Sequence, residues 1–175
     1  MASPAAPAPT TTTTAAADVD ADADAADAEA TLAHVRAYWL SIVPKSPIYG
    51  FLFSGLTITS ASSSGHMHAT LPLSSTHVNS KSSLHGSVSA TLVDLVGGLA
   101  ITAAGRREKN GVSVDMHLSF VSGAREGDVL EVEGVADKVG GSLAFTRVVL
   151  RKVVQGKGRG EWPVVARGSH TKFVR

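Results

Sequence analysis

The sequence lacks cysteine, which excludes a disulfide framework, a thiolate nucleophile and a cysteine-based metal site. It also lacks any run that approaches the roughly 18 consecutive apolar residues of a membrane-spanning helix, because Gly, Ser or His interrupts the apolar segments. These absences predict a soluble protein without a membrane span, and the missing cysteine fits an intracellular one. Whether the compartment is cytoplasmic or mitochondrial stays open.

Basic residues are absent from the first 30 positions, which carry six acidic residues and a net charge of −6. Residues 31–175 carry all 16 basic residues and the other nine acidic ones, a net charge of +7 that favours an anionic ligand. Residues 1–30 offer almost no large apolar side chain, which predicts a disordered acidic tail, with transient helix in the Asp-Ala run as the alternative. One domain is expected over residues 31–175.

From Thr31 apolar residues recur at helical spacing, which predicts a short amphipathic helix. Pro44 and Pro47 end this helix. Two β-type runs follow, residues 50–61 and 65–73, and the Ser-rich turn between them predicts a hairpin. Residues 87–105 lack turn residues and predict a helix of about 18 residues, despite two internal glycines.

Four strand-like runs follow this helix, at residues 111–121, 128–138, 143–152 and 163–174. The first alternates cleanly and places five apolar residues on one face: Val112, Val114, Met116, Leu118 and Phe120. One long helix followed by consecutive strands predicts an α+β fold with an antiparallel sheet.

Asp94 is the one acidic residue between Glu29 and Glu108, and it falls in the middle of the long predicted helix. Its neighbours three and four residues away are small: Ala90, Thr91, Gly97 and Gly98. A stripe of small residues lets a ligand or another backbone come close, so a carboxylate there is partly desolvated. The alternative, that Asp94 only caps or pairs across a tight helix contact, stays open.

Gly86 lies at the start of the same helix, so its N–H is one of the unpaired donors that point the positive end of the helix dipole at an anion or a developing oxyanion. The alternative is a glycine that only permits a sharp entry into the helix. Eight residues separate Gly86 from Asp94, roughly 12 Å along a helix axis. If both act on one carbonyl, the simplest arrangement is a two-fold dimer in which Gly86 of one copy faces Asp94 of the other.

Five segments in order carry a resemblance: Asn79, LHGSVSATLVD, GVSVDMHLSFVSGAREGD, GGSLAFTRVVL and a terminal GSHTKF. Together they resemble the hotdog-fold acyl-CoA thioesterases, in the branch of thioesterase superfamily member 2 (acyl-coenzyme A thioesterase 13) and the phenylacetate-degradation type. The resemblance covers about residues 31–175. It implies a six-stranded antiparallel sheet wrapped around the long helix, a homodimer, and often a homotetramer built as a dimer of dimers.

The resemblance also implies a site shared across the dimer. In it, Asp94 is the general base or nucleophile, the Gly86 N–H polarises the thioester carbonyl, Asn79 orients substrate or water beside Gly86, and Ser113 assists Asp94. The implied contacts to substrate and CoA are His85, Phe120, Lys138, Val139, Gly140, Gly141, Ser142, Leu143 and Phe173.

Several positions depart from the family pattern. The usual HGG reads HGS here, which adds the hydroxyl of Ser87, a possible helix cap, beside the oxyanion donor. Phe120 and Phe173 stand where Tyr and His are usual and so lack their hydrogen-bonding groups. Gly123 and Ser169 stand where Pro and Arg are common.

Other kinds of site are poorly supported by the sequence. His66 and His68 share a strand face, but two ligands do not make a metal site, so no metal is expected. No G-x-S-x-G elbow specifies a serine nucleophile. The GKGRG segment at 156–160 opens no helix and predicts a basic hairpin turn, and the few aromatics are not interleaved with basic residues as nucleic-acid binding would favour.

The sequence therefore predicts an acyl-CoA thioesterase. The expected substrates are medium- to long-chain fatty acyl-CoA, and no cofactor is expected because CoA is part of the substrate. Water activated by Asp94, or Asp94 itself through an anhydride, attacks the carbonyl. A non-catalytic acyl-CoA-binding or scaffold protein and a hotdog hydratase or dehydratase are the alternatives.

Overall fold

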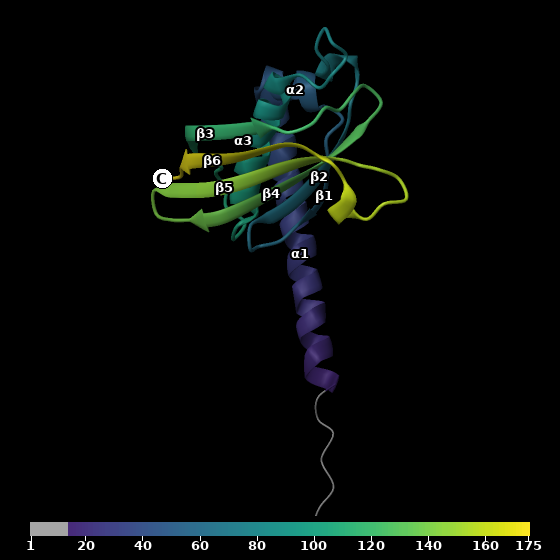
Figure 1. Ribbon diagram of the computed structural model, residues 1–175. Helices are drawn as coiled ribbons and strands as arrows, with labels where there is room; N and C mark the ends of the chain where they lie inside the picture. Colours follow the sequence, from purple (N-terminus) through teal and green to yellow (C-terminus); the bar gives the residue numbers. More distant parts are fainter. Residues whose placement is uncertain (1–13) are drawn as a thin grey trace, which may run out of the picture.

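The computed structural model describes residues 14–175. Its helices and strands in chain order are α1 (Thr14–Ile42), α2 (Pro47–Phe53), β1 (Thr57–Ala61), β2 (His66–Pro72), α3 (Gly86–Ala103), β3 (Val112–Phe120), β4 (Val129–Val139), β5 (Leu143–Lys152) and β6 (Val164–Phe173). Short 3-10 turns lie at Val43–Lys45, Ser75–His77 and Arg159–Glu161. The strands form one curved sheet against α3, and the first part of α1 projects away from it (Figure 1).

The sheet has six strands in the order β1-β2-β4-β5-β6-β3, and every neighbouring pair is antiparallel. The predicted α+β class, the hairpin and the four later strands are therefore confirmed. Because β3 pairs with β6 alone, it forms one edge of the sheet, while β1 forms the other.

Helix α3 is the core element around which the sheet curves, and 13 of its 18 residues are buried. By length and composition it is apolar enough to cross a membrane, but 72% of it is buried inside the fold, as a central helix must be. Glycine permits the close helix–sheet contact: a Cβ on Gly97 would lie 2.7 Å from Thr146 Oγ1, and one on Gly134 would lie 2.7 Å from Val96 Cγ1. Gly97, one of the small residues around Asp94, is therefore needed for the close packing of α3 against the sheet.

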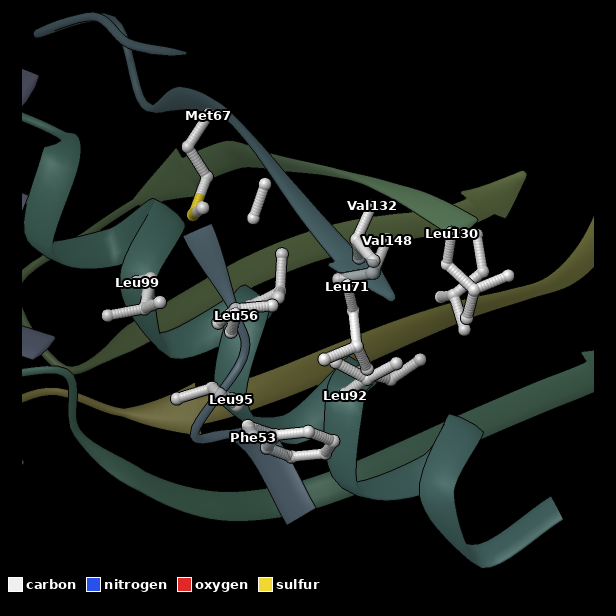
Figure 2. Packing of buried hydrophobic residues seen from close by; sticks show 14 of the residues in the cluster. Phe53, Leu56, Met67, Leu71, Leu92, Leu95, Leu99, Leu130, Val132 and Val148 are labelled. Carbon is white, nitrogen blue, oxygen red and sulfur yellow. The ribbon is translucent and has the colours of Figure 1, made fainter. Parts of the chain in front are cut away.

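Large apolar side chains from the sheet and from α3 meet in a single core (Figure 2). The residues labelled in that view are Phe53, Leu56, Met67, Leu71, Leu92, Leu95, Leu99, Leu130, Val132 and Val148. Burial of one such side chain contributes about 1.5–3 kcal/mol. The core thus holds α3 in a fixed rotation, which fixes the direction of its polar side chains.

Helix α1 begins at Thr14, earlier than the predicted start at Thr31. The Asp-Ala run thus lies in a helix, as the alternative to a disordered tail anticipated, and residues 1–13 lie outside the described residues. The segment from Thr14 to Ile42 is rich in alanine and contains no glycine or proline, which favours helix. Asp27 also holds the helix to the domain, since it accepts hydrogen bonds from Ser63 Oγ at 2.5 Å and Arg106 Nη1 at 2.6 Å.

The predicted β-type run over residues 50–61 is correct only for its second half. Residues 47–53 form α2, and β1 begins at Thr57. Pro47 at the first helical position favours the helix, because its fixed backbone angle suits that position. Phe53 at the end of α2 is completely buried, so packing against the core outweighs the β propensity of this aromatic segment.

The edge strand β3 exposes apolar side chains. Val112, Val114, Met116 and Phe120 are between 40% and 71% exposed, although their alternation predicts one apolar face. A contiguous exposed apolar strand at a sheet edge is typical of a protein–protein contact.

Candidate active site

Asp94 lies at the centre of a cluster of hydrogen-bond donors from three other elements. Its Oδ1 atom accepts from Lys172 Nζ at 2.9 Å and from Ser113 Oγ at 3.3 Å. Its Oδ2 atom accepts from the hydroxyl of Tyr49 at 2.9 Å. Three donors on one carboxylate fix its orientation, whereas the carboxylate of an isolated surface acid is free to rotate in water.

The charge of Asp94 is set by opposing effects. Burial raises the pKa of its carboxyl, but the hydrogen bond and charge of Lys172, with the hydrogen bond of Tyr49, outweigh burial and hold the pKa below its usual value. The side chain keeps 31% of its surface exposed. Asp94 is therefore an ionised carboxylate at neutral pH that remains accessible.

Two inward-facing residues of β6, His170 and Lys172, lie beneath Asp94. Both are buried, and His170 Nδ1 lies 3.7 Å from Asp94 Oδ1. Burial and, after it, the charge of Lys172 lower the pKa of His170 despite the nearby Asp94 carboxylate. Neither ring nitrogen has a hydrogen-bond partner within residues 14–175, so His170 is a neutral imidazole at neutral pH.

A pocket of about 370 Å³ opens beside the carboxylate. Its lining residues are Ser46, Ile48, Tyr49, Ala90, Thr91, Asp94, Ser113 and Met116. The small residues Ala90 and Thr91 of the predicted stripe thus leave space next to Asp94. Asp94 does pair with Lys172, as the alternative of a purely structural acid anticipated, and the open pocket beside the pair is the feature that favours a site.

Gly86 lies in a different pocket, of about 320 Å³, together with Phe120. None of the hydrogen bonds found within residues 14–175 takes its N–H, as expected for the first turn of a helix. The phenyl ring covers the glycine closely, since a Cβ on Gly86 would lie 3.3 Å from Phe120 Cε1. The helix cap is His85, whose Nδ1 accepts from the Ser87 N–H at 3.1 Å, and not Ser87.

The side chain of Asn79 stabilises the loop before α3 by accepting hydrogen bonds from its backbone. Its Oδ1 atom accepts from the N–H groups of Lys81 at 2.9 Å and Ser83 at 3.3 Å. These bonds use the accepting atom of the amide, and the donating Nδ2 atom takes no part in them. The predicted role of Asn79 in orienting substrate stays a prediction.

The predicted CoA contacts separate into two groups. Phe120 pairs with Ala166 at one end of β3, whereas Phe173 pairs with Val112 at the other end and with Leu143 of β5. Eight residues of strand amount to about 27 Å. Lys138 and the turn 139–143 lie at the Phe173 end, because they join β4 to β5.

Two half-sites result within one chain. One half-site, at the start of α3, contains Gly86 and Phe120, which line one pocket, and we include Asn79 and His85 from the segment just before the helix. The other contains Asp94, Ser113 and the Phe173 end of the sheet. Helix spacing predicts that Gly86 and Asp94 cannot easily serve one carbonyl within a chain. In the structure the two residues line different pockets, and their cooperation across a dimer stays a prediction.

Sequence reasoning missed Tyr49, His170 and Lys172. A signal for Lys172 existed: in the run 163–174 it occupies the same alternating face as the buried Ala166 and His170. A lysine on the inward face of a strand needs an acidic partner, and the isolated Asp94 was available. Tyr49 gave no such signal, because it lies between the prolines that close the predicted helix and the β-type run predicted from residue 50.

The histidine pair and the GKGRG segment have structural contacts. His68 Nδ1 lies 2.9 Å from Glu131 Oε1, and Arg159 of the GKGRG segment also pairs with Glu131. Among the described residues, no group of three or more His, Asp or Glu side chains could hold a metal ion.

Comparisons with known proteins agree with this architecture. Residues 82–158 match the family model described as the thioesterase superfamily. A Schizosaccharomyces pombe protein named as an esterase is 34% identical over 145 residues, which cover 82% of this chain and 84% of the relative. Human acyl-coenzyme A thioesterase 13 is 34% identical over 119 residues, which cover 68% and 79% of the two chains. The crystal structure of zebrafish thioesterase superfamily member 2 superposes with a TM-score of 0.66 at 29% identity, over 76% of this chain and 91% of that one.

Proposed function

Since the chain belongs to the thioesterase superfamily and has its hotdog fold, we propose that it hydrolyses acyl-CoA to a free carboxylic acid and CoA, as a thioester hydrolase. The observation that carries this proposal is the ionised Asp94 carboxylate, held by three donors and open to a pocket. That arrangement suits the activation of water next to a bound carbonyl.

In the proposed reaction, Asp94 accepts a proton from water as the water oxygen attacks the thioester carbonyl carbon. The Gly86 N–H of a second copy donates to the developing oxyanion. The C–S bond then breaks, CoA leaves as a thiolate and takes up a proton, and the acid is released. Ser113 assists by fixing Asp94 Oδ1, and the reaction needs no cofactor.

The two half-sites come together if the exposed β3 edges of two copies pair about a two-fold axis. Antiparallel pairing centred on Met116 sets Phe120 of one copy opposite Val112 of the other, because both are four residues from the centre. The Gly86 half-site of one copy then approaches the Asp94 half-site of the other. The exposed apolar residues of β3 support this homodimer, which can in turn assemble as a dimer of dimers.

Val114→Lys is expected to convert the dimer to an 18.0 kDa monomer and to remove thioesterase activity, because it places a charge in the apolar strand contact. Light scattering coupled to gel filtration, followed by a CoA-release assay, measures both effects. Thr57→Lys, on the opposite edge of the sheet, is the matched control and should remain dimeric. A fully active monomeric Val114→Lys protein would contradict the shared site.

The substrate class follows from the apolar side of the Asp94 pocket, where Ile48 and Met116 contribute lining surface. We expect kcat/KM to rise with acyl length by about fourfold per methylene until the available surface is covered, since each buried methylene contributes about 0.8 kcal/mol. Medium- and long-chain fatty acyl-CoA are therefore the proposed substrates, ahead of acetyl-CoA.

A panel of short, medium, long-chain and aryl acyl-CoAs tests the activity and the chain length together. CoA release can be followed with a thiol reagent, because the protein itself contains no cysteine. Turnover that increases with chain length supports the proposal. Binding of acyl-CoA without turnover of any member of the panel would favour an acyl-CoA-binding protein instead.

A further inference from the structure

Tyr49 is held rigidly in a segment that lies outside residues 82–158, the part that matches the family model. Its ring contacts Trp39 with ring centroids 6.2 Å apart and Phe53 with centroids 6.4 Å apart. Both neighbours are buried in the core. The core therefore fixes the position of the phenol ring, and with it the direction of the hydroxyl.

The hydroxyl of Tyr49 donates to Asp94 Oδ2 at 2.9 Å, whereas Lys172 and Ser113 both donate to Oδ1. Within the described residues Tyr49 is thus the one donor found on Oδ2. Without that bond the carboxylate would be held at one oxygen and could rotate. Tyr49 and Asp94 also line the same pocket, so this oxygen lies where substrate or water would enter.

We propose that Tyr49 is a positioning residue for the proposed thioesterase reaction, and that its hydroxyl holds Oδ2 of Asp94 in the orientation that activates water. The catalytic role of Tyr49 rests on the proposed function, whereas the hydrogen bond between Tyr49 and Asp94 is independent of it. Tyr49 remains a donor across the neutral range, because burial and the charge of Asp94 raise the pKa of its phenol.

Four side chains face the carboxylate of Asp94 and can influence its pKa. Tyr49 faces it from α2, Ser113 from β3, and Lys172 and His170 from β6. Lys172 and Tyr49 lower the pKa of Asp94 by hydrogen bonding, and His170 acts in the same direction more weakly. Removal of the Tyr49 hydroxyl alone should therefore raise the pKa of Asp94 while its ion pair with Lys172 remains.

Tyr49→Phe keeps the ring and removes the hydroxyl, and Tyr38→Phe is the matched control because Tyr38 is the only other tyrosine. We expect kcat of Tyr49→Phe to fall about tenfold, the equivalent of one hydrogen bond to a charged group, with KM changed by less than twofold. The acid limb of its pH–rate profile should move to higher pH. Tyr38→Phe should leave the profile unchanged.

A readout independent of activity is the NMR titration of ¹³C-labelled aspartate carboxyls, with the Asp94 signal assigned by its loss in Asp94→Asn. We expect this signal to titrate at higher pH in Tyr49→Phe than in wild type or Tyr38→Phe. An unchanged titration, or a uniform loss of kcat at every pH, would overturn the proposal. If wild type cleaves no acyl-CoA, the proposed function fails separately, and the titration alone decides whether Tyr49 controls Asp94.

Discussion

Asp94→Asn is expected to lower kcat for acyl-CoA hydrolysis by on the order of 10²–10⁴-fold, the usual contribution of a positioned acid–base group. Asparagine keeps the shape of the side chain, and its one amide oxygen can still accept from Lys172 and Ser113 at the Oδ1 position, while its NH2 group faces Tyr49 and cannot accept from it. It cannot accept the proton of water or attack a carbonyl as an anionic nucleophile. The loss should therefore appear in kcat, with substrate binding largely retained.

The matched control is Asp128→Asn. Asp128 forms a partly exposed ion pair with Lys152, with Oδ2 and Nζ 3.7 Å apart, and lies in the turn before β4. This substitution makes the same chemical change away from the pocket and should leave kcat within twofold of wild type. If the folded Asp94→Asn enzyme kept more than a fifth of wild-type kcat, Asp94 would be a structural residue and the proposed mechanism would be wrong.

Lys172→Met is expected to lower both stability and activity, because it leaves the partly buried Asp94 carboxylate without its cation. Breaking a fully buried ion pair costs 3–5 kcal/mol, and since Asp94 retains 31% exposure we expect about 2 kcal/mol. Methionine keeps most of the volume of the side chain, so the change should come from lost charge. Denaturant unfolding measures the stability, and the CoA-release assay should show a loss of about tenfold or more in kcat, equal to one charged hydrogen bond.

The pH dependence of this stability difference has a definite sign. In wild type the folded-state pKa of Asp94 lies below 3.8, so its interactions contribute stability above that pH and the contribution is lost as pH falls through the lowered pKa. In Lys172→Met, burial is opposed by Tyr49 and His170 only, and the pKa of Asp94 rises. The stability difference should therefore be largest at neutral pH and should shrink as pH falls below about 4.

Lys152→Met is the corresponding control, since it removes a lysine that is 32% exposed from its pair with Asp128, whereas Lys172 is only 5% exposed. A surface pair contributes about 0.2–1 kcal/mol, so this variant should be nearly as stable as wild type. A stability difference between Lys172→Met and wild type that did not change between pH 7 and pH 3 would show that lost packing, and not the charge of Asp94, explains the effect.

The sequence by itself determined the features that depend on local patterns. A long run without turn residues predicted α3, alternation predicted β3, and the fixed rise of a helix separated Gly86 from Asp94. The acid in the middle of α3 and the glycine at its start were both identified in this way. Local patterns also misassigned residues 50–53, because an aromatic segment can form either a strand or a short buried helix.

Tertiary structure alone decided which groups surround Asp94. Tyr49 lies 45 residues before it and Lys172 lies 78 residues after it. The pairing of Ser113 with Lys172 depends on the register of β3 against β6, including the bulge between Ser113 and Asp115. No local periodicity encodes such contacts, since they depend on strand register and on the rotation of α3 in the core. The sequence therefore identified the acid, and the packing of distant segments determined how it is held and charged.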